Sequence, residues 1–214
     1  RTTEAVCILP SGNDQWGAAY GSFILAKQAG LDIEFQYAAQ PLKDSNLYMI
    51  PSASGMHSIL RPKWNALLDR VKSGATLYLS LDDAYFTDFN ETFGVELQSR
   101  FTGTSKSSFV MHGIKDSPTL SFNPKTCFSM KTKKAEILGN NVSGNPVFFK
   151  AKYGKGTVYL LTLPLEQLMI SAPGSFQSED TCDAWKIYAL IAEPFCRRRA
   201  LKSNHPLLNV TEHV

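Results

Sequence analysis

Three carboxylates and one histidine could do chemistry in this chain. Asp82 and Asp83 are adjacent and directly follow an apolar run, His57 lies in the small-residue segment 54–57, and Glu166 follows Pro164 and Leu165. Paired carboxylates can act as general acid and base or hold a metal ion, and a histidine can serve as a general base. These residue types would suit hydrolysis, with Asp82, Asp83 or Glu166 working together with His57.

Each of these residues also has an ordinary structural explanation. Asp82 and Asp83 fit a turn that ends a strand, and neighbours on a strand point to opposite sides, so adjacency alone does not make a catalytic pair. His57 fits a loop histidine, and Glu166 fits a cap or an ion pair. The sequence leaves both explanations open for all four residues.

The positioning elements follow from hydrophobic patterning in the first half of the chain. Continuous apolar runs predict strands covered on both faces, and repeats at helical spacing predict amphipathic helices between them. The helix after residue 14 carries the repeat Trp16, Ala19, Tyr20, Phe23, Ile24 and Lys27 and stops at Gly30. The predicted strands cover 5–10, 33–38, 47–51 and 76–81, and the second helix has Pro62 at its start and the stripe Trp64, Leu67, Leu68 and Val71.

This β-α-β order predicts an α/β fold with a doubly wound, mostly parallel sheet. Ligands of such sheets bind at the carboxyl ends of the strands. We therefore expect a crevice whose candidate ligand-binding residues, listed along the chain, are Asn13, Ser54, His57, Asp82, Asp83 and Glu166.

The second half has a different character. Residues 86–145 are rich in Thr, Ser, Lys and Asn, with short β-like runs at 107–112, 119–122 and 127–130, and predict an antiparallel β excursion beside the main sheet, at about 100–145. Residues 146–152 and 157–163, joined by Tyr153-Gly154-Lys155-Gly156, predict a late hairpin. Residues 180–200 predict a closing helix that Pro194 kinks or ends.

Composition excludes several classes of protein. The net charge of +3 comes without a basic stripe interleaved with aromatics, so we expect no nucleic-acid partner. No apolar stretch approaches the roughly 20 residues of a membrane span, so we expect no membrane partner. The four cysteines form no CxxC pair, and the chain has no G-x-G-x-x-G, Walker A or G-x-S-x-G motif, so we expect neither metal nor cofactor.

The order of segments resembles the class I glutamine amidotransferase-like, or flavodoxin-like, fold. The resemblance rests on LYMIPSASG (47–55), RPKWNALLDRVKSG (61–74) and TLYLSLDDA (76–84). Those enzymes carry a nucleophile elbow where this chain has Ser80-Leu81-Asp82-Asp83-Ala84, and a late His-x-Glu where this chain has Thr162-Leu163-Pro164-Leu165-Glu166. The segment 80–84 has neither the cysteine nor the glycines of the elbow, and the late segment lacks the histidine. A nucleophile needs its base within hydrogen-bond reach and neither is present, so we expect no amidotransferase activity.

The chain is similar to the non-catalytic version of that fold, the trimerisation domain of bacterial β-galactosidases and related multidomain glycoside hydrolases. The hairpin segment 153–160, the following Pro164-Leu165-Glu166 and the tail 205–213 carry this resemblance. It implies one domain over 1–202 and a linker over 203–214 to a missing downstream domain. The implied partners are a catalytic barrel and a C-terminal β-sandwich of the same polypeptide, or further copies in a homo-oligomer. The cysteine pattern fits the bacterial cytoplasm but does not fix the compartment.

Three hypotheses follow. The leading one is an accessory or oligomerisation domain of a glycoside hydrolase that is not an enzyme by itself, which predicts an exposed apolar or aromatic surface. The second is a small-molecule or saccharide-binding module that uses the crevice at the strand ends, which predicts a partly polar pocket there. The third is a stand-alone hydrolase, which predicts cooperating carboxylates, at least one of them with a perturbed pKa.

Overall fold

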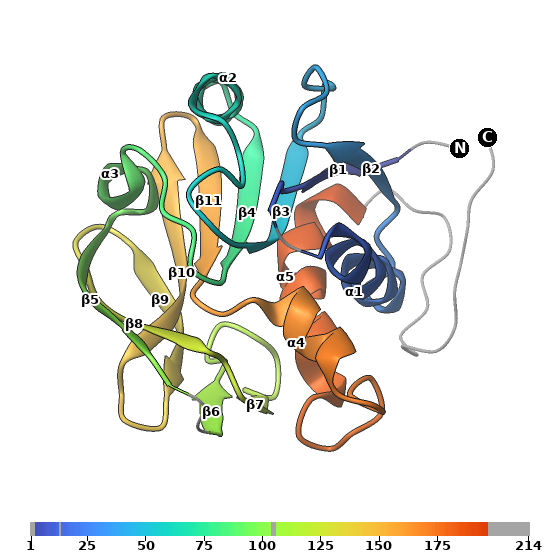
Figure 1. Cartoon of the computed structure of the whole chain (residues 1–214), viewed down its shortest axis with the longest axis vertical. Helices are drawn as coiled ribbons and strands as arrows, with labels where there is room; N and C mark the ends of the chain where they lie inside the picture. Colours follow the sequence, from blue (N-terminus) through green and yellow to red (C-terminus); the bar gives the residue numbers. More distant parts are fainter. Residues whose placement is uncertain (1–2, 13, 104–105, 197–214) are drawn as a thin grey trace.

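The core of the protein is a nine-stranded sheet, half parallel and half antiparallel (Figure 1). A computed structural model describes residues 3–12, 14–103 and 106–196. The strand order is β2-β1-β3-β4-β11-β10-β9-β6-β7, and the first five of these strands pair in parallel. Their bounds are β1 (Ala5–Leu9), β2 (Ile33–Tyr37), β3 (Leu47–Ala53), β4 (Thr76–Leu81) and β11 (Gly156–Leu161).

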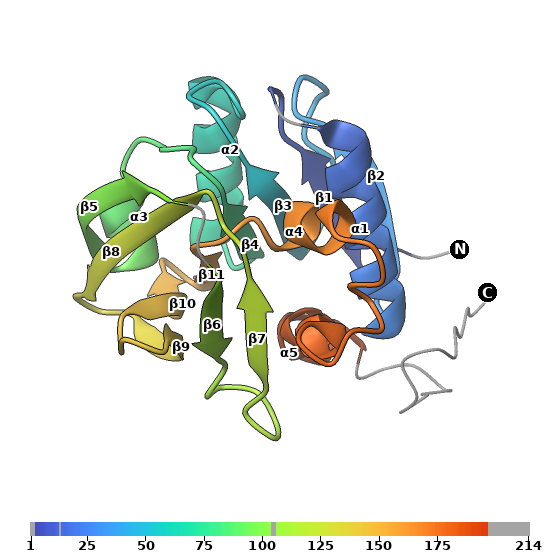
Figure 2. The same cartoon turned by 60° about the horizontal axis from the view of Figure 1, so that its bottom comes forward.

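Helices cover both faces of the parallel half, which explains its continuous apolar strands. On one face lie α1 (Gln15–Gln28), α4 (Leu165–Ser171) and α5 (Trp185–Cys196), the last preceded by a 3-10 turn at Cys182–Ala184. On the other face lie α2 (Arg61–Lys72) and α3 (Phe89–Phe93). The predicted α/β class is therefore confirmed, with helices on both faces of the parallel half of the sheet (Figures 1 and 2).

The antiparallel half differs in part from the prediction. The late hairpin is present as β10 (Pro146–Tyr153) and β11, paired antiparallel. The excursion is not wholly beside the main sheet, because β9 (Glu136–Asn141), β6 (Ser107–Val110) and β7 (Thr119–Phe122) continue that sheet past β10. Only β5 (Val95–Thr102) and β8 (Thr126–Thr132) form a separate two-stranded sheet.

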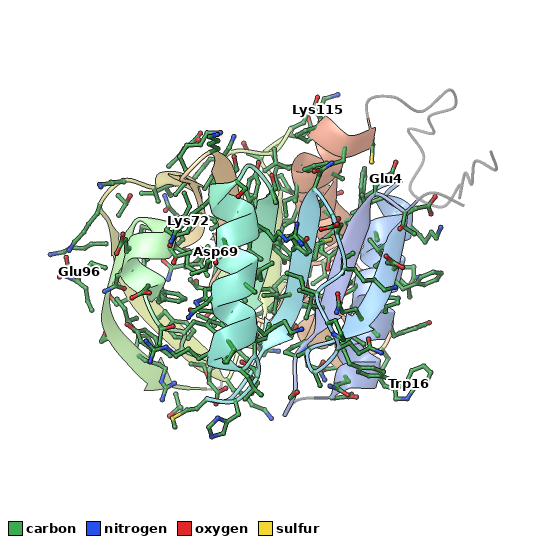
Figure 3. All side chains as sticks on the ribbon, turned by 90° about the horizontal axis from the view of Figure 1, so that it is seen from above. Glu4, Trp16, Asp69, Lys72, Glu96 and Lys115 are labelled. Carbon is green, nitrogen blue, oxygen red and sulfur yellow. The ribbon has the colours of Figure 1, made fainter. Side chains whose placement is uncertain are left out.

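The first helix is turned in an unexpected direction. An apolar repeat at helical spacing usually faces the core, yet the repeat of Trp16, Tyr20 and Phe23 lies on the outside, with Trp16 85% exposed (Figure 3). The buried face consists mainly of small residues, namely Gly17, Ala18, Gly21, Ser22, Leu25 and Ala26. A Cβ atom added at Gly21 would lie 2.5 Å from the backbone oxygen of Glu166, so only glycine lets α1 pack this closely on α4.

The closing helix is shorter than predicted within the described chain. Pro194 lies inside α5, which ends two residues later at Cys196. Residues 197–202 of the predicted domain and the predicted linker 203–214 lie outside the described residues. Among the residues that the structure describes, no helix is long and apolar enough to span a membrane.

Candidate functional site

The loops after β3 and β4 meet at the carboxyl edge of the sheet, and Asp83 joins them. Its Oδ1 accepts a 2.8 Å hydrogen bond from the Ser54 hydroxyl and a 2.6 Å bond from the Gly55 N–H. Arg100 Nη1 on β5 donates to the Asp83 backbone oxygen at 2.8 Å. The predicted crevice residues Ser54, Asp82 and Asp83 are therefore neighbours, whereas Asn13 lies outside the described residues.

The two adjacent aspartates have different electrostatic environments. Burial and the negative charge of Asp83 raise the pKa of Asp82, although the hydroxyls of Ser54 and Thr126 oppose the rise. Burial acts against Asp83 ionisation too, but the Gly55 N–H, the Ser54 hydroxyl and Arg100 outweigh it and lower the pKa of Asp83. The two aspartates share the Ser54 hydroxyl, while Thr126 contributes only to Asp82 and the Gly55 N–H only to Asp83.

His57 does not join these carboxylates. Its side chain is exposed and makes no hydrogen bond with Asp82, Asp83 or Glu166 among the described residues. A general base must lie within hydrogen-bond reach of its partner. In the part of the chain that the structure describes, no group of three or more His, Cys, Asp or Glu side chains could hold a metal ion.

Glu166 is the centre of a separate, fully buried cluster under α4. Its Oε1 accepts hydrogen bonds from the hydroxyls of Tyr78, at 3.0 Å, and Tyr188, at 2.8 Å. Its Oε2 accepts from the hydroxyls of Ser52, at 2.8 Å, and Ser80. The carboxylate is 0% exposed and satisfied by four hydroxyl donors, with residues from β3, β4 and α5 converging on α4. We call this set (Glu166, Ser52, Tyr78, Ser80 and Tyr188) the Glu166 cluster.

The groups around Glu166 are held in unreactive states. Burial, followed by the charge of Glu166, raises the pKa of Tyr78 and of Tyr188 well above the usual value. Burial also raises the pKa of the nearby Cys7 thiol, so this cysteine is not a thiolate nucleophile. Ser52 has the only positive φ on a described strand, +48°, and its hydroxyl also accepts from the Gln167 N–H at 3.1 Å.

Sequence reasoning selected Glu166 but placed it in the crevice and missed its partners. The signal that could have found one of them is Ser80, a small polar residue between Leu79 and Leu81 in the strand 76–81. The tyrosines carry no such signal, because Tyr78 in a strand and Tyr188 on an apolar helix face are typical core residues.

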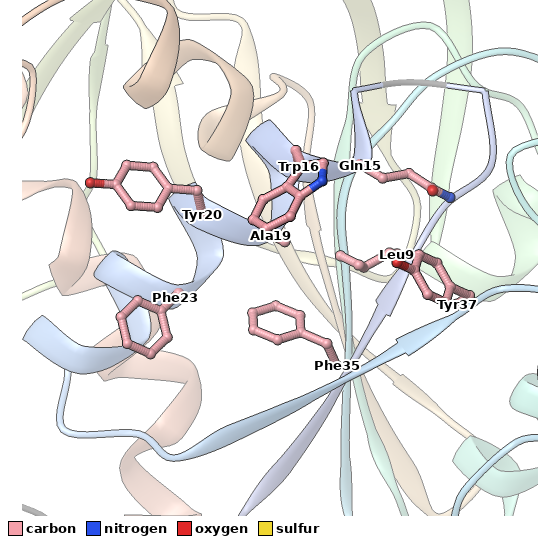
Figure 4. Close-up of a pocket in the computed structure, with 8 residues that line it drawn as sticks. All are labelled: Leu9, Gln15, Trp16, Ala19, Tyr20, Phe23, Phe35 and Tyr37. Atoms are coloured by element: carbon pink, nitrogen blue, oxygen red, sulfur yellow. The ribbon is translucent and has the colours of Figure 1, made fainter.

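A third feature lies on the opposite side of α1. A hollow of about 560 Å³ is lined by α1, by β2 and by Leu9 at the end of β1 (Figure 4). We call it the aromatic groove, and its lining residues are Leu9, Gln15, Trp16, Ala19, Tyr20, Phe23, Phe35 and Tyr37. In the sequence, the groove is indicated by the aromatic repeat of α1. That repeat by itself predicts a buried helix face and no ligand site.

Known structures share this fold. One is an exo-β-1,4-mannosidase from an Opitutaceae bacterium, with a TM-score of 0.68, 14% identity, and coverage of 88% of this chain and 35% of that chain. Another is a β-galactosidase from Rahnella sp. R3, with a TM-score of 0.68, 14% identity, and coverage of 97% and 33%. The protein has the fold of a domain found within glycoside hydrolases. This chain spans about a third of the length of those two enzymes.

The same fold also exists as a chain of similar size. A cytoplasmic protein from Salmonella typhimurium LT2 has a TM-score of 0.60 and 16% identity, and the match covers 89% of this chain and 98% of that one. No family model and no curated protein sequence matches the chain. At these identities the structural matches establish the glycoside hydrolase domain fold and nothing of the chemistry.

Proposed function

We propose that this chain is a non-catalytic accessory domain of a multidomain glycoside hydrolase and packs against a catalytic barrel of the same polypeptide. The barrel would carry the carboxylate pair that cleaves the sugar. This domain would supply binding and assembly surfaces, including contacts in a homo-oligomer.

The observation that carries the proposal is the sealed state of Glu166. A catalytic carboxylate has to reach substrate or water, and Glu166 is fully buried with both oxygens occupied by hydroxyl donors. In the crevice, Asp83 is hydrogen-bonded within the turn. His57 makes no hydrogen bond with either aspartate among the described residues. These contacts among the described residues support the proposal that catalysis takes place outside this chain.

The fold comparison supports the assignment to a larger enzyme. Two glycoside hydrolases contain this fold over about a third of their length. The same proposal includes a finer assignment of the fold. We assign it to the amidotransferase-like or flavodoxin-like type, as in the trimerisation domain of β-galactosidases. The parallel order β2-β1-β3-β4-β11 supports it, since it matches the flavodoxin-type order of five strands.

We assign the barrel-facing side to the loops after β3 and β4. Met56 is 81% exposed and Tyr85 50% exposed, on the two loops that Asp83 ties together, and Leu60 before α2 is also exposed. Interfaces are enriched in Met and Tyr at their centres. Because Asp83 fixes the two loops against each other, the apolar side chains would dock as a preformed surface.

A second candidate is a free-standing binding protein that uses the crevice at Ser54, Asp82 and Asp83. The match over 98% of the Salmonella chain favours it, because that solved chain consists almost entirely of this fold. The sequence flanking residues 1–214 in the gene separates the two candidates. A (β/α)8 barrel upstream is expected for the accessory domain, and its absence would overturn the proposal.

An assay tests the lack of catalysis directly. The isolated chain is incubated with nitrophenyl β-galactoside and β-mannoside, beside the Asp82→Asn variant. We expect no turnover from either protein. Turnover by the unmodified chain that Asp82→Asn abolishes would show a working site and contradict the proposal.

Docking is tested in the full-length polypeptide. Met56→Glu and Tyr85→Glu should loosen the domain from the barrel and expose the connection between them to proteolysis. Val142→Glu, a matched change at a side chain that is 73% exposed on the opposite, antiparallel half, should have no effect. Equal sensitivity of all three variants would rule out these loops as the docking side.

A further inference from the structure

The aromatic rings of the groove are exposed because α1 packs on the rest of the protein through its opposite side. Trp16, Tyr20 and Phe23 lie on one side of the helix because the other side, with Gly17 and Gly21, is packed on α4. The side chain of Asp14 caps the helix through the Gly17 N–H at 3.0 Å, and Ser22 bonds back to Ala18. The orientation of α1 is therefore fixed, and the exposed rings form a stable surface.

The groove is neutral. None of its eight lining residues is charged, although 19% of the chain is charged. The nearest cation along the helix, Lys27, is paired with Asp32 at 2.6 Å. Lys27 lies 5.8 Å from the centre of the Phe23 ring and lines the neighbouring hollow, but its charge is balanced by Asp32, so the eight uncharged lining residues favour a neutral ligand.

The groove also carries polar groups at the edges of its aromatic rings. The indole N–H of Trp16 and the hydroxyls of Tyr20 and Tyr37 make no hydrogen bond to other described residues, and all three residues are more than half exposed. The faces of aromatic rings are electron-rich and attract polarised C–H groups, while the phenol and indole groups bond to hydroxyls. A pyranose ring offers both an apolar C–H face and a rim of hydroxyls.

The surface continues beyond a single ring. Tyr20 and Phe23 also line a second hollow of about 710 Å³, which extends along α1 to the end of α4 and to Phe176. Two adjoining hollows that share two aromatic side chains suit an elongated ligand. A short chain of sugars matches this shape better than a single sugar does.

We propose that the aromatic groove between α1 and β2 binds a neutral oligosaccharide, with Trp16 as the main stacking platform and Tyr20 and Tyr37 as supporting groups. This inference goes beyond the accessory role, because it assigns a ligand to the chain itself and stands whether or not a barrel accompanies it. Ser54 and Asp82 of the crevice are not among the lining residues of the groove.

A second protein molecule is the competing occupant. The four exposed aromatic residues (Trp16, Tyr20, Phe23 and Tyr37) leave roughly 500 Å² of ring surface outside, taking about 200 Å² for each residue. A stable interface needs about 800 Å² from each partner. The concave shape and limited area favour a small ligand.

The test is calorimetric titration of the 214-residue chain with 1,4-linked galactotriose and mannotriose. We expect saturable binding of at least one of them, weakened by about tenfold or more in Trp16→Ala and less in Tyr37→Phe. Phe101→Ala removes an aromatic side chain that is 55% exposed outside the groove and should bind like the unmodified chain. An acidic trisaccharide, galacturonotriose, should bind more weakly than the neutral ones.

Three results would overturn the proposal. They are no binding of either neutral trisaccharide, equal binding by the unmodified chain and Trp16→Ala, and tighter binding of galacturonotriose. Sedimentation covers the competing occupant, since a dimer that Trp16→Ala dissociates and that neutral sugar leaves intact would assign the groove to a second copy of the chain. All variants are first checked for unchanged thermal unfolding.

Discussion

Helix α1 separates two regions that treat their side chains in opposite ways. On its inner side, the polar Glu166 cluster is completely buried and every oxygen of the carboxylate is engaged. On its outer side, large aromatic side chains stand in solvent around a neutral groove. Ordinary burial would hide the aromatics and expose the carboxylate.

The contrast indicates that the two sides of α1 have different roles. The buried carboxylate joins β3, β4, α4 and α5 through hydroxyl donors and stabilises one arrangement of these elements. The outer face is free of that task, because small residues already provide the packing of α1. The buried carboxylate thus connects elements of the fold, and the exposed aromatic side chains are the groups that we propose for binding.

The largest effect should come from Glu166→Leu. The change leaves four buried hydroxyls without their acceptor, and each unsatisfied buried group costs about 1–3 kcal/mol, not additively, so we expect a loss of about 4 kcal/mol of unfolding free energy. Denaturant unfolding measures it. Glu166→Gln keeps one acceptor oxygen and should lose about half as much, and a neutral effect of Glu166→Leu would remove the structural role of the cluster.

The next effect concerns the close contact of α1 with α4. Gly21→Ala places a Cβ atom against the backbone of Glu166 and should cost about 2 kcal/mol, despite the better helix propensity of alanine. The matched control Gly103→Ala meets no atom within 4 Å and should be near neutral. Stabilisation by Gly21→Ala would show that the inner face of α1 is not tightly packed.

On the outer face, Trp16→Ala should change stability by no more than about 0.5 kcal/mol, because the side chain is 85% exposed. Denaturant unfolding of Trp16→Ala beside the unmodified chain measures this change in unfolding free energy. A large loss would mean that Trp16 belongs to the core, and the contrast between the two sides of α1 would fail.

Another small effect is the pH dependence of the aspartate turn. The pKa of Asp82 is raised in the folded protein, so its ionisation opposes folding above that pKa. Asp82→Asn should therefore stabilise the protein at neutral pH by less than about 1 kcal/mol, and the gain should vanish below pH 3.8, the pKa of the unfolded state.

Asp83 has a lowered pKa, so Asp83→Asn should destabilise the protein at neutral pH, and this loss should fade as the pH falls through the folded pKa. Urea unfolding at several pH values measures both changes.

The parts predictable from sequence are those set by local pattern. Strands at 5–10 and 76–81 and the hairpin around Gly154 follow from apolar runs and a turn, and the meeting of Ser54 with Asp83 follows from the rule for strand ends. The β-like runs predicted at 107–112, 119–122 and 127–130 correspond to β6, β7 and β8, whereas β5 and β9 were not predicted. The sheet to which each of these strands belongs could not be predicted, because strand pairing depends on distant partners and not on local periodicity.

The Glu166 cluster and the orientation of α1 depend on long-range packing. Ser52, Ser80 and Tyr188 are far apart in the chain, and only the register of β3 with β4 and the docking of α5 bring them together. Helix α1 has two sides that could face the core, one aromatic and one made of small residues. The aromatic side is the more obvious of the two in the sequence. The close approach of Gly21 to α4 decides the outcome, and no local signal shows it.

The most direct test of the account follows the indole N–H signals of Trp16, Trp64 and Trp185 by nuclear magnetic resonance while neutral trisaccharide is added. The buried Trp64, whose indole donates to the Thr87 backbone oxygen at 3.0 Å, serves as an internal control. The account predicts a saturable shift of the Trp16 signal, an unmoved Trp64 signal and an intact sugar throughout. An unmoved Trp16 signal, or cleavage of the sugar by the chain alone, would contradict it.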